Sequence, residues 1–320
     1  MTLGSSLEVV TFGEAMVLHL AEPGVPLAAA TRLRRSVAGS ELNVAVGLAR
    51  LGVRTGWFGR LGDDVHGRLV AGVLRAEGVD TSRLRLVPDG WTGLLVRDAH
   101  AERPITVVYH RAGSAASTMT ADDVDPDYLA GASTLFLSGI TAVLSESARA
   151  ASARAVEVAT EHGLTVVFDP NLRKLLGPVE RTAEVLRPLA AAAHVVLAGR
   201  EEAELITGES DPAAAANWFL QRSARLVVLK DGARGSWATD GTRTWEQPAV
   251  PVRAIDPVGA GDAFTAGFLA GLERTGDVAD ALRAGATVAA AVVAVAGDIE
   301  GLPTAAELAL MQGRGEAVQR

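Results

Sequence analysis

Short apolar runs of strand length alternate with longer runs of helical periodicity along most of the chain. The strand-like runs cover residues 7–13, 56–61, 134–137, 165–168, 194–197 and 226–229. The helical runs cover residues 41–51, 65–77, 145–162, 179–193, 212–223 and 265–272. Apolar strands separated by helices are typical of parallel pairing through βαβ crossovers. The pattern therefore predicts an α/β fold, with a doubly wound, mainly parallel sheet flanked by helices on both faces.

Two segments in the first third of the chain interrupt this alternation. Residues 16–37 and 91–111 carry strand-like stretches without a helix between them. We expect them to form a small antiparallel sheet that projects from the main sheet. It is either an edge meander or a lid over a site at the carboxyl ends of the parallel strands. No Pro- or Ser-rich linker and no fixed repeat is visible, so we expect one domain over residues 1–320, with the lid inserted in it.

Composition narrows the class of protein. The 320 residues include no Cys, which excludes a disulfide scaffold, a thiolate zinc site and a Cys nucleophile. The formal net charge of −8 argues against a general nucleic-acid binder. Only Lys174 and Lys230 are lysines, so Arg supplies nearly all of the positive side-chain charge, and a lone Arg is weak support for a site. No secretory signal is visible, and the longest apolar stretch, 284–296, falls short of the ~20 residues that span a bilayer. We expect a cytoplasmic protein without a membrane partner.

One string of residues, 256–264, indicates a chemical function for the protein. Residues 256–264 read Asp-Pro-Val-Gly-Ala-Gly-Asp-Ala-Phe and lead into a predicted helix. Small residues at Gly259, Ala260 and Gly261 allow a tight turn onto the helix start, whose unpaired N–H groups and dipole form an anion site. A carboxylate there suits a base that takes a proton from a hydroxyl attacking a phosphoryl group, which makes Asp262 the candidate. From the residues alone, a loop with Asp262 as a helix N-cap is the alternative. A dinucleotide fingerprint and a Walker A loop are both absent from the sequence.

The whole string resembles the C-terminal signature of the ribokinase-like (PfkB) carbohydrate kinases. Residues 39–45, leading to 48–52, resemble the family's N-terminal signature, and residues 59–64 with Gly67 follow as the family expects. The resemblance covers about residues 7–303. It implies the ribokinase-like fold with a small β-sheet lid, ATP and Mg²⁺ in the reaction, a monovalent cation such as K⁺, and association of two or more copies through the lid.

Within the family, the details look most like 2-keto-3-deoxygluconate (KDG) kinases. The matching strings are residues 13–16, 109–115, 137–141 and 169–173. They suit an acidic sugar, because the planar fork of Arg pairs a carboxylate bidentately, and Arg111 and Arg173 are the candidates. The resemblance implies transfer of the γ-phosphate of ATP to a primary hydroxyl of KDG, giving 6-phospho-KDG. A kinase for a neutral sugar such as fructose or ribose, or a non-catalytic sugar or nucleotide sensor, is the alternative.

The resemblance also assigns roles to single residues. Gly39, Ser40 and Asn43 would line the sugar site, and Asp298 would hold a hydroxyl of the substrate. Tyr109 and Arg111 would contact the sugar acid from the lid. Arg173 would approach the substrate or the transferred phosphate. Lys230, Gly232 and Gly235 match the family's nucleotide-binding loop, and Gly259, Ala260 and Gly261 match its anion hole. Asp262 matches the catalytic base, and Glu202 matches a group that organises Mg²⁺ through water. Three positions depart from the family pattern: Gly199 replaces an Asn, Leu95 a Tyr that KDG kinases often have, and Ala286 an Asn.

Overall fold

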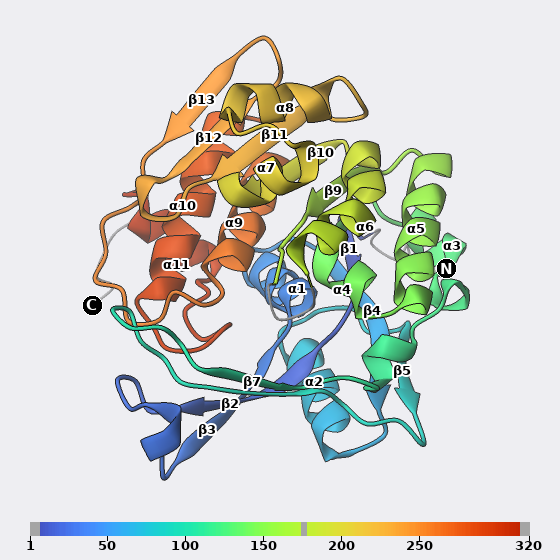
Figure 1. The fold of residues 1–320 in the computed structure, drawn as a ribbon, viewed down its shortest axis with the longest axis vertical. Helices are drawn as coiled ribbons and strands as arrows, with labels where there is room; N and C mark the ends of the chain where they lie inside the picture. The colour runs from blue at the N-terminus through green and yellow to red at the C-terminus, as the bar shows by residue number, and fades with distance from the viewer. Residues whose placement is uncertain (1–6, 174–177, 314–320) are drawn as a thin grey trace.

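The main sheet has nine strands in the order β13-β12-β11-β10-β9-β8-β1-β4-β5 (Figure 1). The computed structural model describes residues 7–173 and 178–313. The strands are β1 (Val9–Phe12), β4 (Thr55–Gly62), β5 (Leu84–Val87), β8 (Thr134–Ser138), β9 (Thr165–Asp169), β10 (Val195–Gly199), β11 (Leu226–Lys230), β12 (Ser236–Thr239) and β13 (Thr244–Gln247). Neighbours from β11 to β5 are parallel, and β12 and β13 add an antiparallel edge. The predicted parallel sheet is confirmed.

Helices cover both faces of this sheet. They are α1 (Ser40–Arg50), α2 (Val65–Ala76), α3 (Pro126–Ala130), α4 (Gly139–Leu144), α5 (Glu146–Glu161), α6 (Val179–Ala192), α7 (Arg200–Thr207), α8 (Pro212–Leu220), α9 (Ala260–Thr275), α10 (Val278–Val293) and α11 (Ala305–Met311). Successive residues of β1 point to opposite faces. Val9 packs in the core with α1, α9 and α10, whereas Val10 packs in the core with α5, α6 and α8. None of the described helices combines the length and apolar character needed to cross a membrane.

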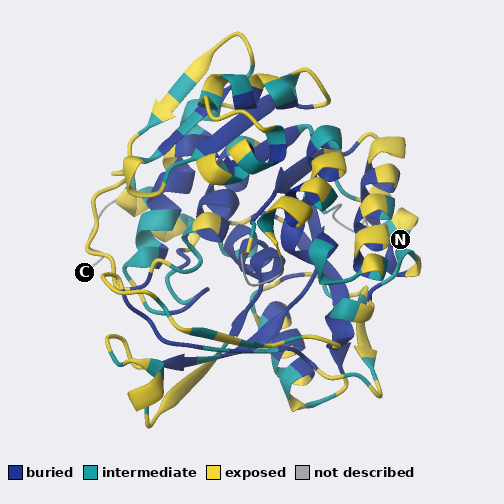
Figure 2. Cartoon of the chain, in the orientation of Figure 1, coloured by how far each residue is buried: buried dark blue, intermediate teal, exposed yellow. Residues whose placement is uncertain are grey.

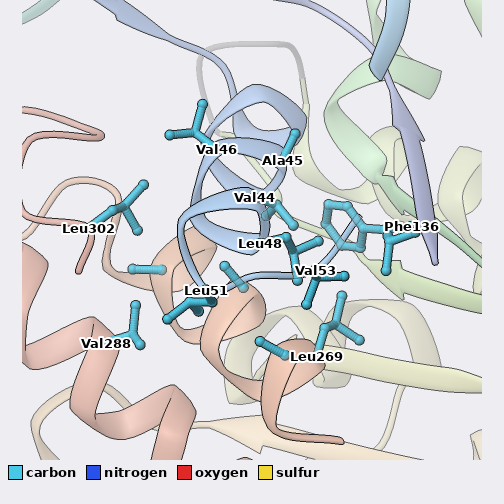
Figure 3. Close-up of a cluster of buried hydrophobic side chains, with 14 of the residues drawn as sticks. Val44, Ala45, Val46, Leu48, Leu51, Val53, Phe136, Leu269, Val288 and Leu302 are labelled. Atoms are coloured by element: carbon cyan, nitrogen blue, oxygen red, sulfur yellow. The ribbon is translucent and has the colours of Figure 1, made fainter. Parts of the chain in front are cut away.

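Helix α1 lies in the middle of one core rather than at its surface. Its residues from Ser40 to Leu48 are all buried. Figure 3 shows Val44 and Leu48 beside Phe136 of β8, and Leu269 of α9 belongs to the same cluster. A Cβ at Gly47 would lie 2.6 Å from the Cβ of Ala266 on α9, so the two helices touch closely at this point. Close packing on all sides leaves α1 little freedom to move. The polar groups at its N-terminus are therefore held in place.

A second sheet of four strands forms the lid, in the order β3-β2-β6-β7. Its strands are β2 (Met16–Ala21), β3 (Leu33–Ala38), β6 (Leu94–Arg97) and β7 (Val107–His110). The predicted small sheet is confirmed, but the antiparallel arrangement is wrong at its centre, where β2 and β6 are parallel. Both strands continue strands of the parallel sheet, β1 and β5, and so leave it in the same direction. Figure 2 shows the lid buried where it meets the main body and exposed toward the far end of β3.

Candidate active site

A pocket of about 1390 Å³ opens where the carboxyl ends of β9, β10 and β11 meet the start of α9 and the lid. Such a volume exceeds the usual range for one small ligand and has room for a nucleotide together with a sugar. Every site residue predicted from the sequence lines it: Gly39, Ser40, Asn43, Tyr109, Arg111, Arg173, Glu202, Lys230, Gly232, Gly235, Gly259, Ala260, Gly261, Asp262 and Asp298. Gly39 and Asp298, which are 259 residues apart in the chain, thus meet in one cavity.

The N-terminus of α9 forms one wall of the pocket. Gly259 is its N-cap and has φ +84°, a conformation that a side chain would strain. A Cβ there would also lie 3.1 Å from the carbonyl oxygen of Asp298. Among the described residues, no side chain caps this helix. The N–H of Ala260 donates to the carbonyl of Pro257 at 3.4 Å, and the N–H groups of Gly261 and Asp262 are open to a ligand. The alternative interpretation of Asp262 as the N-cap is wrong, because Asp262 lies in the first turn.

The Asp262 carboxylate is held by three side chains. Ser40 Oγ donates to Oδ1 at 2.8 Å, Asn43 Nδ2 donates to Oδ2 at 2.8 Å, and Asn171 Nδ2 donates to Oδ1 at 3.1 Å. Asp262 is only 5% exposed. Burial raises its pKa, against the opposing charge of Arg173. A fixed carboxylate with a raised pKa is well suited to accept a proton.

Lys230 lies beside the anion site, at the end of β11. Its Nζ is 2.5 Å from Oδ2 of Asp169, at the end of β9. Burial lowers the pKa of Lys230, but Asp169 and Glu202 more than compensate, so the pKa is raised and the ammonium stays charged. A Cβ at Gly261 would lie 3.8 Å from this ammonium. A cation and free helix N–H groups therefore share the same corner of the pocket.

Glu202 is held by backbone groups. Its carboxylate accepts from the N–H of Gly199 at 2.6 Å and from the N–H of Leu172 at 2.8 Å. Gly199, where the family has Asn, thus contacts Glu202 through its backbone. Burial raises the pKa of Glu202, and Asp169 adds to the effect. In the described part of the chain, no three His, Cys, Asp or Glu side chains gather closely enough to hold a metal ion by themselves.

Arg111, which directly follows lid strand β7, also lines the pocket. An Nη of Arg111 pairs with the carboxylate of Glu14, and the guanidinium lies 5.0 Å from the centre of the Tyr109 ring. Burial raises the pKa of Glu14, with Arg111 opposing it. The Nε of Arg111 has no partner among the described groups. Leu95 packs with Tyr109 in the apolar cluster of the lid.

Sequence reasoning missed several groups that this geometry brings in. Asp169, Asn171 and Asp256 stood in the quoted strings without a role, and Glu14 was noted only as a position in a motif. Asn171 adopts φ +43°, which Asn tolerates better than most residues, and this turn places its amide at Asp262. Arg97 gave no signal, because it is one of many arginines and lies in no motif.

Comparison with known proteins identifies the family of this chain. A model of the "pfkB family carbohydrate kinase" matches residues 6–305. The chain is 36% identical to a 2-dehydro-3-deoxygluconokinase of Bacillus subtilis, covering 95% of this chain and 94% of the relative. It is 32% identical to a 5-dehydro-2-deoxygluconokinase of Shouchella clausii, covering 95% of both. A crystal structure of a PfkB protein from Polaromonas superimposes with a TM-score of 0.85 at 37% identity, covering 95% of this chain and 99% of that one. The fold is thus ribokinase-like, and the chain belongs to the pfkB family of carbohydrate kinases.

Proposed function

We propose that this kinase transfers the γ-phosphate of ATP to a primary hydroxyl of a sugar acid, and that the acceptor is KDG, which is 2-dehydro-3-deoxygluconate. The observation that carries the proposal is the buried Asp262 carboxylate at the uncapped N-terminus of α9. Two arginines, Arg111 and Arg173, supply positive charge in the same pocket. Relatives at 36% and 32% identity are both named for sugar acids. Cationic side chains near the acceptor are what a carboxylate-bearing sugar requires.

Each of the site residues has a separate role in the proposed reaction. The acceptor oxygen forms a bond to the γ-phosphorus, and the bond from that phosphorus to the oxygen it shares with the β-phosphate breaks, releasing ADP. Asp262 takes the proton of the attacking hydroxyl. The N–H groups that follow Gly259 and the Lys230 ammonium stabilise the negative charge on the transferred group. Ser40 and Asn43 keep the carboxylate aimed at the acceptor.

Mg²⁺ fits the pocket only as an ion bound mainly to phosphate. Mg²⁺ typically keeps several waters and binds through one or two carboxylates together with substrate phosphates. Glu202 already accepts two backbone N–H groups, so it would contact the ion through water. When bound, the ion neutralises phosphate charge. Lys230, Gly232 and Gly235 would hold the nucleotide, with Ala286 on the purine side.

Four expectations stay predictions. They are a requirement for K⁺, a cytoplasmic location, a single domain over residues 1–320, and a dimer or higher oligomer that associates through the lid. The K⁺ requirement is tested by replacing KCl with tetramethylammonium chloride at equal ionic strength in the kinase assay.

The proposed function is tested by ADP release at fixed MgATP with KDG, gluconate, fructose and ribose as acceptors. We expect the highest kcat/KM with KDG, and a phosphate ester on its primary hydroxyl. A higher kcat/KM with fructose or ribose would show a neutral-sugar kinase. No ADP release with any acceptor, from protein that binds ATP, would favour a sensor.

A further inference from the structure

Arg97, the last residue of lid strand β6, forms a buried bridge between two carboxylates. Its Nη1 is 2.8 Å from Oδ2 of Asp256, and its Nη2 is 2.8 Å from Oδ1 of Asp298. Arg97 is 1% exposed and Asp256 is 0% exposed. A guanidinium so fully withdrawn from water is costly unless its partners compensate. The catalytic scheme above does not use this group.

Asp298 lines the active-site pocket, whereas Asp256 is fully buried next to the lining residues Pro257 and Val258. Asp256 begins the loop that leads into Gly259, and its oxygens accept from the N–H of Val258 at 3.2 Å and the N–H of Gly297 at 3.0 Å. It therefore joins the loop before α9 to the segment that contains Asp298. Arg97 ties this joined structure to the lid.

The bridge also reaches the proposed base. Oδ2 of Asp298 lies 3.4 Å from Nδ2 of Asn43, the same amide nitrogen that donates to Asp262 at 2.8 Å. Arg97, Asp298, Asn43 and Asp262 thus form one chain of contacts from the lid to the catalytic carboxylate. Burial raises the pKa of Asp298, while Arg97 opposes that rise. Without the guanidinium, two buried carboxylates would be left without a cation.

We propose that Arg97 is a positioning residue for phosphoryl transfer, a built-in cation that holds the anion-binding loop and Asp298 in place and fixes the lid to them. The inference rests on the proposed role of Asp262 and the α9 N-terminus, and it does not depend on which sugar is the acceptor. Its effect should fall on the chemical step. A shift of about 1 Å in a catalytic group can lower a rate by about 100-fold.

The test compares Arg97→Ala with the matched control Arg34→Ala. Arg34 is also an arginine of the lid, and it also contacts the 296–300 segment, through Glu300 at 3.2 Å and the carbonyl of Ala296, but its side chain is 50% exposed. With the acceptor that gives the highest rate in the panel, Arg97→Ala should lower kcat about 100-fold and change the sugar KM less than about threefold. Arg34→Ala should leave both nearly unchanged. Millimolar guanidinium chloride should restore part of the Arg97→Ala rate and leave the wild-type rate unchanged.

Three results would overturn the inference. One is a wild-type kcat in Arg97→Ala, and another is a loss confined to the sugar KM, because that would mean Arg97 only holds the lid. If circular dichroism shows that Arg97→Ala does not fold, Asp256→Asn tests the bridge from its other end. We expect Asp256→Asn to lower kcat at least tenfold at unchanged ATP affinity. A wild-type kcat in Asp256→Asn would be the third result that overturns the inference. A wild-type enzyme without activity on any acceptor contradicts the proposed function as well, whereas an active wild type with unaffected variants contradicts the inference alone.

Discussion

The contact of Arg111 with Glu14 changes what the removal of Arg111 is expected to show. The arginine side chain is 10% exposed and pairs with a buried carboxylate, and its Nε has no partner among the described groups. If this guanidinium also binds the carboxylate of the acceptor, Arg111→Ala removes the substrate contact and leaves Glu14 without a cation. Truncating one partner of a desolvated charge pair costs about 2–5 kcal/mol. The kcat/KM for KDG should therefore fall by roughly one and a half to three and a half decades.

A double-mutant cycle separates the two contributions. Glu14→Gln removes the buried charge while keeping an acceptor for Arg111, and Arg111→Ala is then measured in that background. We expect the loss of kcat/KM for KDG to persist there, with less than about threefold change for fructose used as a poor acceptor. Arg103→Ala, which removes a lid arginine that donates to the carbonyl of Gly24, is the matched control. A large loss in the wild type that disappears in the Glu14→Gln background would refute a substrate role for Arg111.

Three other charged groups of the protein can be tested in the same way. Glu202→Gln should raise the Mg²⁺ concentration needed for half-maximal rate. The control Glu204→Gln, at an exposed position on the same helix, should not. Equal Mg²⁺ profiles of the two variants would mean that Glu202 only caps its helix, through the N–H of Gly199. Arg173 lowers the pKa of Asp262. Arg173→Gln should therefore move the acid limb of the kcat/KM profile to higher pH, and an unmoved limb would contradict Asp262 as the titrating base. Burial raises the pKa of Glu41 from 4.5 to about 8, so the folded protein retains a proton that the unfolded chain loses, and stability falls as pH rises between these values. Glu41→Gln should abolish that fall, on the order of 3 kcal/mol between pH 5 and pH 8 by chemical denaturation, and parallel stability curves would contradict it.

Six of the seven described parallel strands could be predicted, because they form apolar runs of strand length. Strand β5 was missed, since it is half-exposed and carries Arg85. The antiparallel hairpin of β12 and β13 was missed, since Ser236–Thr239 and Thr244–Gln247 lie at the edge and mix polar with apolar residues. Helix α7 gives only a weak helical pattern, because its apolar face is short and only Ala203 and Ile206 are buried. Short or half-exposed elements give weak periodicity.

The site was predictable where chemistry depends on local backbone. Gly259, Gly261 and Asp262 form one helix start within a few residues, so the string alone indicated an anion site. Groups defined by tertiary contact were not predictable. One partner of Arg97, Asp256, is 159 residues away, and the pairing appears only when the lid folds back onto the loop.

The central claim is that Asp262 takes the proton of the acceptor hydroxyl, and Asp262→Asn tests it most directly. In MgATP with the best acceptor, the account predicts a fall of kcat by roughly 10²–10⁴-fold, the usual contribution of a positioned general base. The circular dichroism spectrum and the ATP dissociation constant, measured by calorimetry, should stay at wild-type values. A variant that binds ATP normally and retains near wild-type kcat would contradict the account.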